Sequence, residues 1–201
     1  MIRLRKLALL CVVTLLPTVP ALAGDATVPA ASYTLDPRHS QVIFGIRHMG
    51  LSVFFGRFSK VTGTLTFDPN APEKSALDAE IDMTAIDTHV PELDQELAGG
   101  SVFDAKQFPT AKFHATGITK TGANTGTVTG DLTLHGVTKP VTLNVVFDGG
   151  TSPPIPFSKF RIGFDATGTI KRSDFGITPA MWSSMVSDDV TLQIEAEFEK
   201  N

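Results

Sequence analysis

The residues best suited to nucleophilic catalysis in this 201-residue sequence are Asp36, His39 and Ser40. Together they supply an acid, a base and a hydroxyl, which are the three groups of a hydrolytic triad. All three stand close together in the chain, however, and no G-x-S-x-G turn is present to expose a nucleophile. Triads are assembled from distant parts of a fold around a prepared oxyanion site. We therefore expect that the protein is not an enzyme.

The histidines lack the spacing of a metal site. They stand at positions 39, 48, 89, 114 and 135, so neither an H-x-H nor an H-x-x-x-H pair occurs. Cys11 is the one cysteine, and it lies in an N-terminal segment that we expect to be removed, so no thiolate ligand is available. Acidic residues alternate with apolar ones, which is typical of a solvated strand face rather than of paired catalytic carboxylates. The sequence predicts neither a metal site nor a cofactor.

The N-terminus has the pattern of a secretory signal peptide. A basic start precedes the apolar stretch 7–16, and a small-x-small sequence ends at Ala23. We expect a signal peptide over residues 1–23, a periplasmic location, and one mature domain over residues 24–201. The mature domain contains no stretch apolar enough for a membrane helix. Its 14 basic and 21 acidic residues argue against nucleic acid as a partner.

The elements that would position any site read mostly as strands. Val42, Phe44, Ile46 and His48 share one face of an extended segment, because side chains alternate with a period of two. A second run, from residue 52 to 67, is long for one strand. We expect Gly56 and Gly63 to interrupt it, because a missing side chain lets a strand bend or bulge. Further strands are expected at 32–35, 77–83, 111–119, 127–134, 141–147, 160–170 and 190–198.

A single helix interrupts the strands. Val90, Leu93 and Leu97 recur at helical spacing between His89 and Gly100. About eight strands joined by short turns favour an all-β fold, either an antiparallel barrel or a sandwich. If Ser32 to Leu35 is an edge strand, it could pair across a homodimer.

Several pieces of the sequence resemble the YceI family of exported, lipocalin-like lipid-binding proteins. They are H-S-x-V-x-F at His39 to Phe44 with Arg47-His48 behind it, G-x-F at Gly56 to Phe58, F-D-x-x-x-F-P-x-x-x-F at Phe103 to Phe113, G-D-L-T-L-H-G-V-T-K-P-V at Gly130 to Val141, and R-x-D-F-G at Arg172 to Gly176. The resemblance implies an extended eight-stranded antiparallel barrel with a helix over one opening. It also implies a tunnel that binds polyisoprenoids or similar long-chain amphiphiles. The bulky stretch 181–184 departs from the family pattern.

The aromatic composition agrees with an apolar ligand, since the chain has 14 Phe but one Tyr and one Trp and thus few polar aromatic handles. Any single Phe is more commonly core than ligand wall. The best candidates for the tunnel lining are Phe44, Ile46, Phe54, Phe58, Phe103, Phe108, Phe113, Phe164 and Phe175. Each lies on an aromatic strand face or on the connector after the helix.

Two residues are candidates for contact with a ligand head group. His48 continues the face of Phe44 and Ile46, although a structural role is equally open. Arg172 could bind a phosphate, or it could pair with Asp174. We therefore expect a periplasmic carrier for a polyisoprenoid such as a quinone or prenyl phosphate. The alternative is a filled, ligand-free barrel that acts as a stress or protein-interaction module.

Overall fold

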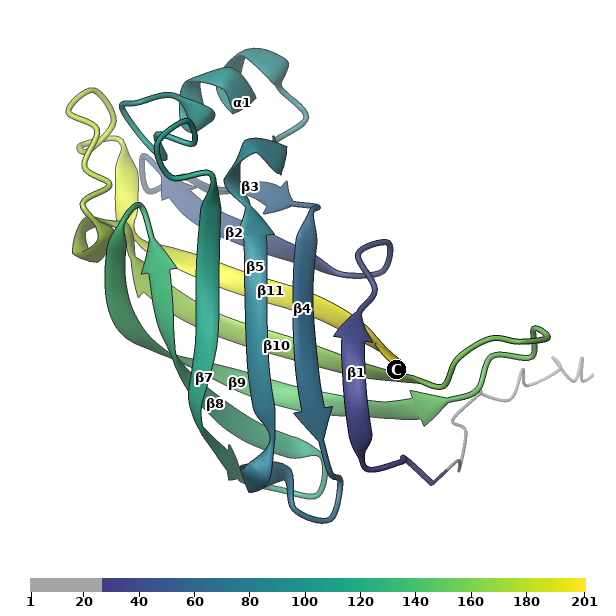
Figure 1. Cartoon of the computed structure of the whole chain (residues 1–201). Coiled ribbons are helices and arrows are strands. Elements are labelled where there is room, and N and C mark those ends of the chain that lie inside the picture. Colours follow the sequence, from purple (N-terminus) through teal and green to yellow (C-terminus); the bar gives the residue numbers. More distant parts are fainter. Residues whose placement is uncertain (1–26) are drawn as a thin grey trace, which may run out of the picture.

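Strands make up most of the chain and join into one antiparallel sheet that closes on itself (Figure 1). The computed structural model describes residues 27–201, and the signal peptide expected over residues 1–23 lies outside them. The strands are β1 (Ala31–Leu35), β2 (Gln41–His48), β3 (Ser52–Phe58), β4 (Val61–Phe67), β5 (Ala76–Asp82), β6 (Ile86–Asp87), β7 (Thr110–Lys120), β8 (Thr125–Leu134), β9 (Val137–Thr151), β10 (Arg161–Lys171) and β11 (Val186–Lys200).

The closed ring has eight strands. It runs β1-β4-β5-β7-β8-β9-β10-β11, and the pairing of β1 with β11 completes it. The eight-stranded antiparallel barrel implied by the family resemblance is therefore confirmed. β2, β3 and β6 continue the sheet beyond β11 at the end of the barrel that carries the helix (Figure 1). The helical segments are α1 (Pro91–Ala98) and the 3-10 turns η1 (Pro72–Lys74), η2 (Met83–Ala85) and η3 (Arg172–Phe175).

The long run after β2 is broken at residues 59–60, between β3 and β4. Gly56 and Gly63 lie within these strands and their pairing has no register shift, so the prediction that they interrupt the run is wrong. A Cβ atom at Gly56 would lie 2.3 Å from the ring of Phe44, and one at Gly63 would lie 2.7 Å from the carbonyl oxygen of Asp78. Both positions require glycine because a neighbouring group occupies the space that a side chain would need.

β1 is paired on both sides, so the prediction that residues 32–35 form an edge strand is wrong. It bonds to β4 along one side and to β11 along the other. Its backbone groups are therefore used within the barrel and are not free to pair with a second copy. A homodimer would need another surface.

The helix expected between His89 and Gly100 is α1, and it lies across one end of the barrel (Figure 1). Leu93 and Leu97 of α1 line the barrel interior. The helix thus caps an opening, as expected. None of the helices within residues 27–201 has the length and apolar character needed to cross a bilayer.

Buried apolar side chains form two clusters along the barrel. One cluster includes Phe58 and Phe175, near α1 and η3. The other includes Tyr33 and Ile162, around β1 and the start of β10. The partly buried Val42, Leu77 and Ile81 pack against both clusters and so connect them.

Candidate functional site

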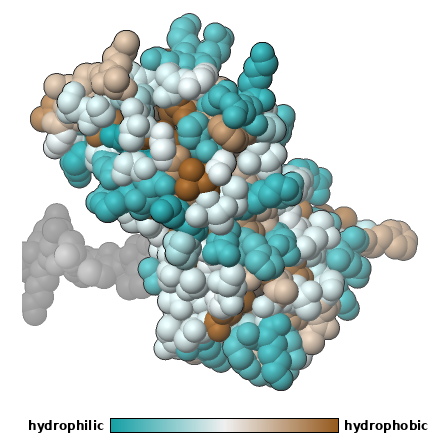
Figure 2. Space-filling view, turned by 60° about the vertical axis from the view of Figure 1, so that its left-hand side comes forward, coloured by the Kyte–Doolittle hydropathy of each residue, from teal (hydrophilic) through white to brown (hydrophobic). Residues whose placement is uncertain are grey.

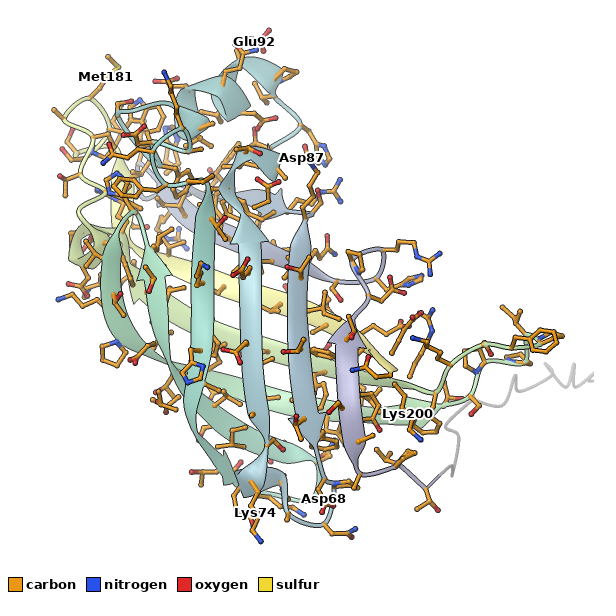
Figure 3. The ribbon with its side chains drawn as sticks, in the orientation of Figure 1. Asp68, Lys74, Asp87, Glu92, Met181 and Lys200 are labelled. Carbon is orange, nitrogen blue, oxygen red and sulfur yellow. The ribbon has the colours of Figure 1, made fainter. Side chains whose placement is uncertain are left out.

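Two cavities occupy the barrel interior, one toward each end. The upper cavity lies beneath α1 and has a volume of about 490 Å³. The lower cavity reaches the β4–β5 and β7–β8 turns and has a volume of about 380 Å³. Figure 3 labels Glu92 and Met181 at the upper end, and Asp68 and Lys74 at the lower end. Each cavity falls in the usual range of small-molecule sites, about 300–1,000 Å³.

β2 supplies a row of four side chains to the upper cavity. Val42, Phe44, Ile46 and His48 all line it, as the period of two predicts. Gly56 of β3 stands opposite Phe44, and its missing side chain leaves room for the Phe44 ring. The strand pattern alone therefore fixes which side chains of β2 face the cavity.

An aromatic contact connects this wall to the segment after α1. The ring centroid of Phe58 lies 5.7 Å from that of Phe44 and 5.7 Å from that of Phe103, the second pair in an edge-to-face arrangement. Phe54 lines the same cavity from β3. Rings from two strands and one connector thus enclose the space under the helix.

Three polar side chains line the upper cavity, namely those of His48, Glu96 and Arg172. His48 and Glu96 are exposed, since His48 ends β2 and Glu96 lies on α1. Arg172 is only 8% exposed. The upper cavity therefore combines an apolar wall with a small polar group at its end, which is the usual composition of a site for an amphiphile.

The guanidinium of Arg172 has no carboxylate partner within residues 27–201. Its Nε donates to the carbonyl oxygen of Ser187 at 3.1 Å, and its Nη1 donates to that of Ile177 at 2.8 Å. No pair forms with Asp174, so that interpretation is wrong. A guanidinium has five N–H donors, and the Nη2 group bonds to none of the described residues. A buried positive charge with unused donors can bind an anionic or strongly polar group.

Exposed apolar side chains stand beside the upper cavity. Met49 and Leu51 in the β2–β3 turn are 60% and 82% exposed, and Met181 is 75% exposed. The amide of Met49 donates to the carbonyl oxygen of Met185 at 2.6 Å, which joins the two segments. Figure 2 shows hydrophobic residues visible among hydrophilic ones in the upper part of the molecule. A hydrocarbon chain that extended out of the cavity at this end would therefore contact apolar side chains.

The lower cavity has its own aromatic wall. Phe164 lies 5.5 Å from Phe67, 5.1 Å from Phe147 and 6.0 Å from Phe198, measured between ring centroids. Phe113 lines the same cavity from β7. Apolar side chains thus line both cavities, although Lys120 and Asn124 also border the lower one.

The predicted lining residues divide into three groups. Phe44, Ile46, Phe54, Phe58 and Phe103 line the upper cavity together with His48 and Arg172, whereas Phe113 and Phe164 line the lower cavity. The prediction is wrong for Phe108 and Phe175, which line neither. Phe175 is 1% exposed in the core, and the half-buried ring of Phe108 packs edge-to-face on His135 at 4.9 Å.

Sequence reasoning missed much of the upper wall. The stretch 178–187, for which no strand or helix is predicted above, contributes Pro179, Trp182, Met185 and Val186 to the cavity. Aliphatic side chains complete the wall, and an inward strand period was the signal for most of them. They are Ile81, Met83, Val102, Ala111, Leu132, Leu134, Ile170, Ile177, Val190 and Leu192.

The three residues that suggested a triad hold a bend between β1 and β2. Nδ1 of His39 lies 2.8 Å from the Asp36 carboxylate, but the Ser40 hydroxyl bonds to the backbone of Glu197, accepting from its amide at 3.0 Å. The Asp36 amide donates to the Glu197 carbonyl oxygen at 2.8 Å. Ser40 is thus used where β11 changes its partner from β2 to β1.

Asp36, His39 and Glu197 lie close enough together to hold a metal ion, a grouping that spacing along the chain did not indicate. The guanidinium of Arg161 already supplies the positive charge, bonding to Asp36 at 2.7 Å and also to Glu197 and Glu199. Burial alone would raise the pKa of Asp36, but hydrogen bonds from the Arg38 amide, His39 and Arg161 hold that pKa well below its usual range. We therefore interpret this cluster as a structural ion-pair network.

The closed eight-stranded ring, the capping helix and the apolar interior define a lipocalin-like β-barrel. The family model of the YceI-like domain matches residues 33–198, so the chain belongs to the YceI family. The "UPF0312 protein" of Pseudomonas syringae pv. tomato is 36% identical over 176 residues, which cover 86% of this chain and 91% of that protein.

Solved structures agree with this assignment. BcnA of Burkholderia cenocepacia is 28% identical, with a TM-score of 0.73 over 81% of this chain and 98% of that one. A polyisoprenoid-binding domain from Saccharophagus degradans is 16% identical, with a TM-score of 0.61 over 84% of this chain and 98% of that one. The second likeness concerns the fold alone.

Proposed function

We propose that the protein is a periplasmic carrier that binds a polyisoprenoid or a similar long-chain amphiphilic lipid inside its barrel. The observation that carries the proposal is the upper cavity, an apolar space of about 490 Å³. Its wall includes the buried Arg172, which forms no ion pair with a carboxylate of residues 27–201. The signal-peptide pattern of residues 1–23 supports the periplasmic location. The fold relative from Saccharophagus degradans, a polyisoprenoid-binding domain, supports the ligand class.

The energetics assign different roles to the apolar wall and the polar end. Burying roughly 500 Å² of isoprenoid at about 25 cal/mol per Å² contributes on the order of 12 kcal/mol before ordering costs. A charge-assisted contact to a head group adds about 1.5–3 kcal/mol. The apolar wall therefore selects the ligand class, and His48 and Arg172 sort head groups within it. A prenyl phosphate would use the charge of Arg172, and a quinone would use hydrogen bonds alone.

The filled-barrel alternative requires side chains to occupy the interior, and the interior instead has two cavities. Binding rather than catalysis also suits the geometry around Ser40, whose hydroxyl bonds to the backbone of Glu197 and not to His39. We therefore favour a lipid carrier over a protein-interaction module or an esterase.

Trp182 offers a direct test, because it is the one tryptophan of the chain and lines the upper cavity. We would delipidate the protein and titrate it with a prenyl phosphate, a prenyl quinone and, as a control, inorganic phosphate. The proposal predicts a saturable change in tryptophan fluorescence with the prenyl compounds and none with inorganic phosphate. No response to either prenyl compound, with neither one co-eluting in gel filtration, would contradict it.

A further inference from the structure

The two cavities meet at three residues. Val42, Ile81 and Leu132 line both the upper and the lower cavity, and no other residue within 27–201 lines both. A side chain common to two adjoining cavities lies at the boundary between them. The barrel interior therefore consists of two chambers joined at one place.

The packing of the core places two of these residues between neighbouring groups of buried side chains. Val42 and Ile81, like Leu77, contact the apolar cluster around Phe58 and also the one around Tyr33. Leu132 is a buried member of the first cluster, with 8% of its surface exposed. All three residues of the boundary are therefore held by the surrounding core.

The three residues reach the interior from separate parts of the wall. Val42 lies on β2, Ile81 on β5 and Leu132 on β8 (Figure 1). None of these strands pairs with another of the three in the sheet order. Branched aliphatic side chains from separate strands narrow a barrel without adding a polar group, and small changes of rotamer alter the opening that they leave.

We propose that Val42, Ile81 and Leu132 form a waist that decides how long an isoprenoid chain the barrel accepts. This inference rests on the proposed function. A short prenyl chain fits within the upper chamber, whereas a longer chain buries its distal units only by passing the waist into the lower chamber. The aromatic wall of Phe67, Phe147, Phe164 and Phe198 then receives that distal part.

A substitution that fills the waist separates short from long ligands. We would compare Val42→Phe with Ile43→Phe, since Ile43 is the next residue of β2 and faces the opposite, outer side. The probes are farnesol and solanesol, which share one head group and differ in chain length. Each would be supplied in phosphatidylcholine vesicles. Trp182 fluorescence reports occupancy of the upper chamber, and mass spectrometry of extracts gives the amount bound.

We expect Val42→Phe to lower the affinity for solanesol by about tenfold or more and to change that for farnesol by less than about threefold. Ile43→Phe should bind both alcohols like the wild type. Equal loss of both alcohols in Val42→Phe, or unchanged binding of solanesol, would overturn the waist. If the wild type binds neither alcohol, the proposed function fails and the waist fails with it.

Ile81→Phe provides a second route to the same test, because it fills the waist from another strand. We expect the same selective loss of solanesol. Circular dichroism first establishes that each variant is folded, and the folded variant is the one titrated. Wild-type binding of solanesol by a folded Ile81→Phe would contradict the proposal, whatever the outcome for Val42→Phe.

Discussion

Two arginines at the opposite ends of β10 have very different surroundings. Arg161 begins the strand, and its guanidinium bonds to the carboxylates of Asp36, Glu197 and Glu199. Arg172 follows the last residue of the strand and is held by two backbone carbonyls, with no carboxylate among the described residues within ion-pair distance. Both are largely buried. One guanidinium is paired directly with three carboxylates, and the other is not.

The difference separates a structural group from a candidate binding group. A buried charge that is fully paired has no capacity left for a ligand, and its removal leaves partners stranded. A buried charge held only by neutral carbonyls keeps donors and field for an incoming anion. Neither residue type nor burial distinguishes the two arginines, so the distinction rests on their partners.

The largest expected effect follows from removing the paired arginine. Arg161→Met removes the least exposed cation that pairs with Asp36, whose side chain is 3% exposed, and we expect a loss of about 3–5 kcal/mol in the free energy of unfolding. Urea denaturation measures it. Arg38→Met is the matched control, because Arg38 also contacts Asp36 but is 73% exposed, and it should cost less than about 1 kcal/mol. An equal loss of unfolding free energy in the two variants would contradict the structural role assigned to Arg161.

Two phenylalanines show a similar contrast, because one is packed in the core and the other lines a cavity. Phe175 is 1% exposed and lines neither interior cavity, so Phe175→Ala should cost about 3–5 kcal/mol in the free energy of unfolding. Phe58 faces the upper cavity, and Phe58→Ala should cost less than about 3 kcal/mol while altering lipid binding. Denaturation curves of both variants measure the loss in unfolding free energy, and Trp182 fluorescence titrations measure the change in lipid binding. A larger cost for Phe58→Ala would indicate a filled interior.

Removing the unpaired arginine should change selectivity more than stability. We expect Arg172→Gln to weaken binding of a prenyl phosphate by about 10- to 100-fold and to leave binding of the corresponding prenyl alcohol nearly unchanged. Lys171→Gln is the control, since Lys171 is exposed and pairs with Asp189 at 2.6 Å. Fluorescence titrations give both affinities. An equal loss for the phosphate and the alcohol would show that Arg172 acts through packing alone.

The smallest effect concerns acid pH. Because the pKa of Asp36 is depressed in the folded state, its stabilising contribution is present above the unfolded carboxyl value of about 3.9 and is lost as the pH falls below it. The stability difference between the wild type and Asp36→Asn should therefore narrow as the pH is lowered from about 7 to about 3. Unfolding midpoints in urea at each pH measure it. A constant difference would mean that Asp36 is not bound in this network.

Short-range patterns predicted much of this molecule. The period of two placed the β2 row on the cavity wall, and helical spacing located α1 to within two residues at each end. The family resemblance supplied the closed ring of eight strands. These features depend on neighbouring residues or on motifs that the sequence displays directly.

Long-range pairing could not be predicted in the same way. Arg161 and Asp36 are 125 residues apart, and no local signal connects them. Phe175 was predicted to line the tunnel together with the aromatic residues of the strand faces, yet the turn η3 buries its ring in the core. The pairing of β1 with both β4 and β11 likewise depends on ring closure. Neither composition nor local spacing indicates which distant residues pair.

The most direct test of the lipid-carrier proposal is mass spectrometry of an organic-solvent extract from the natively purified protein. The proposal predicts a stoichiometric polyprenyl species, and its mass would identify the head group that meets His48 and Arg172. An empty extract, together with no uptake of added quinone or prenyl phosphate, would contradict the carrier function and direct the search to protein partners.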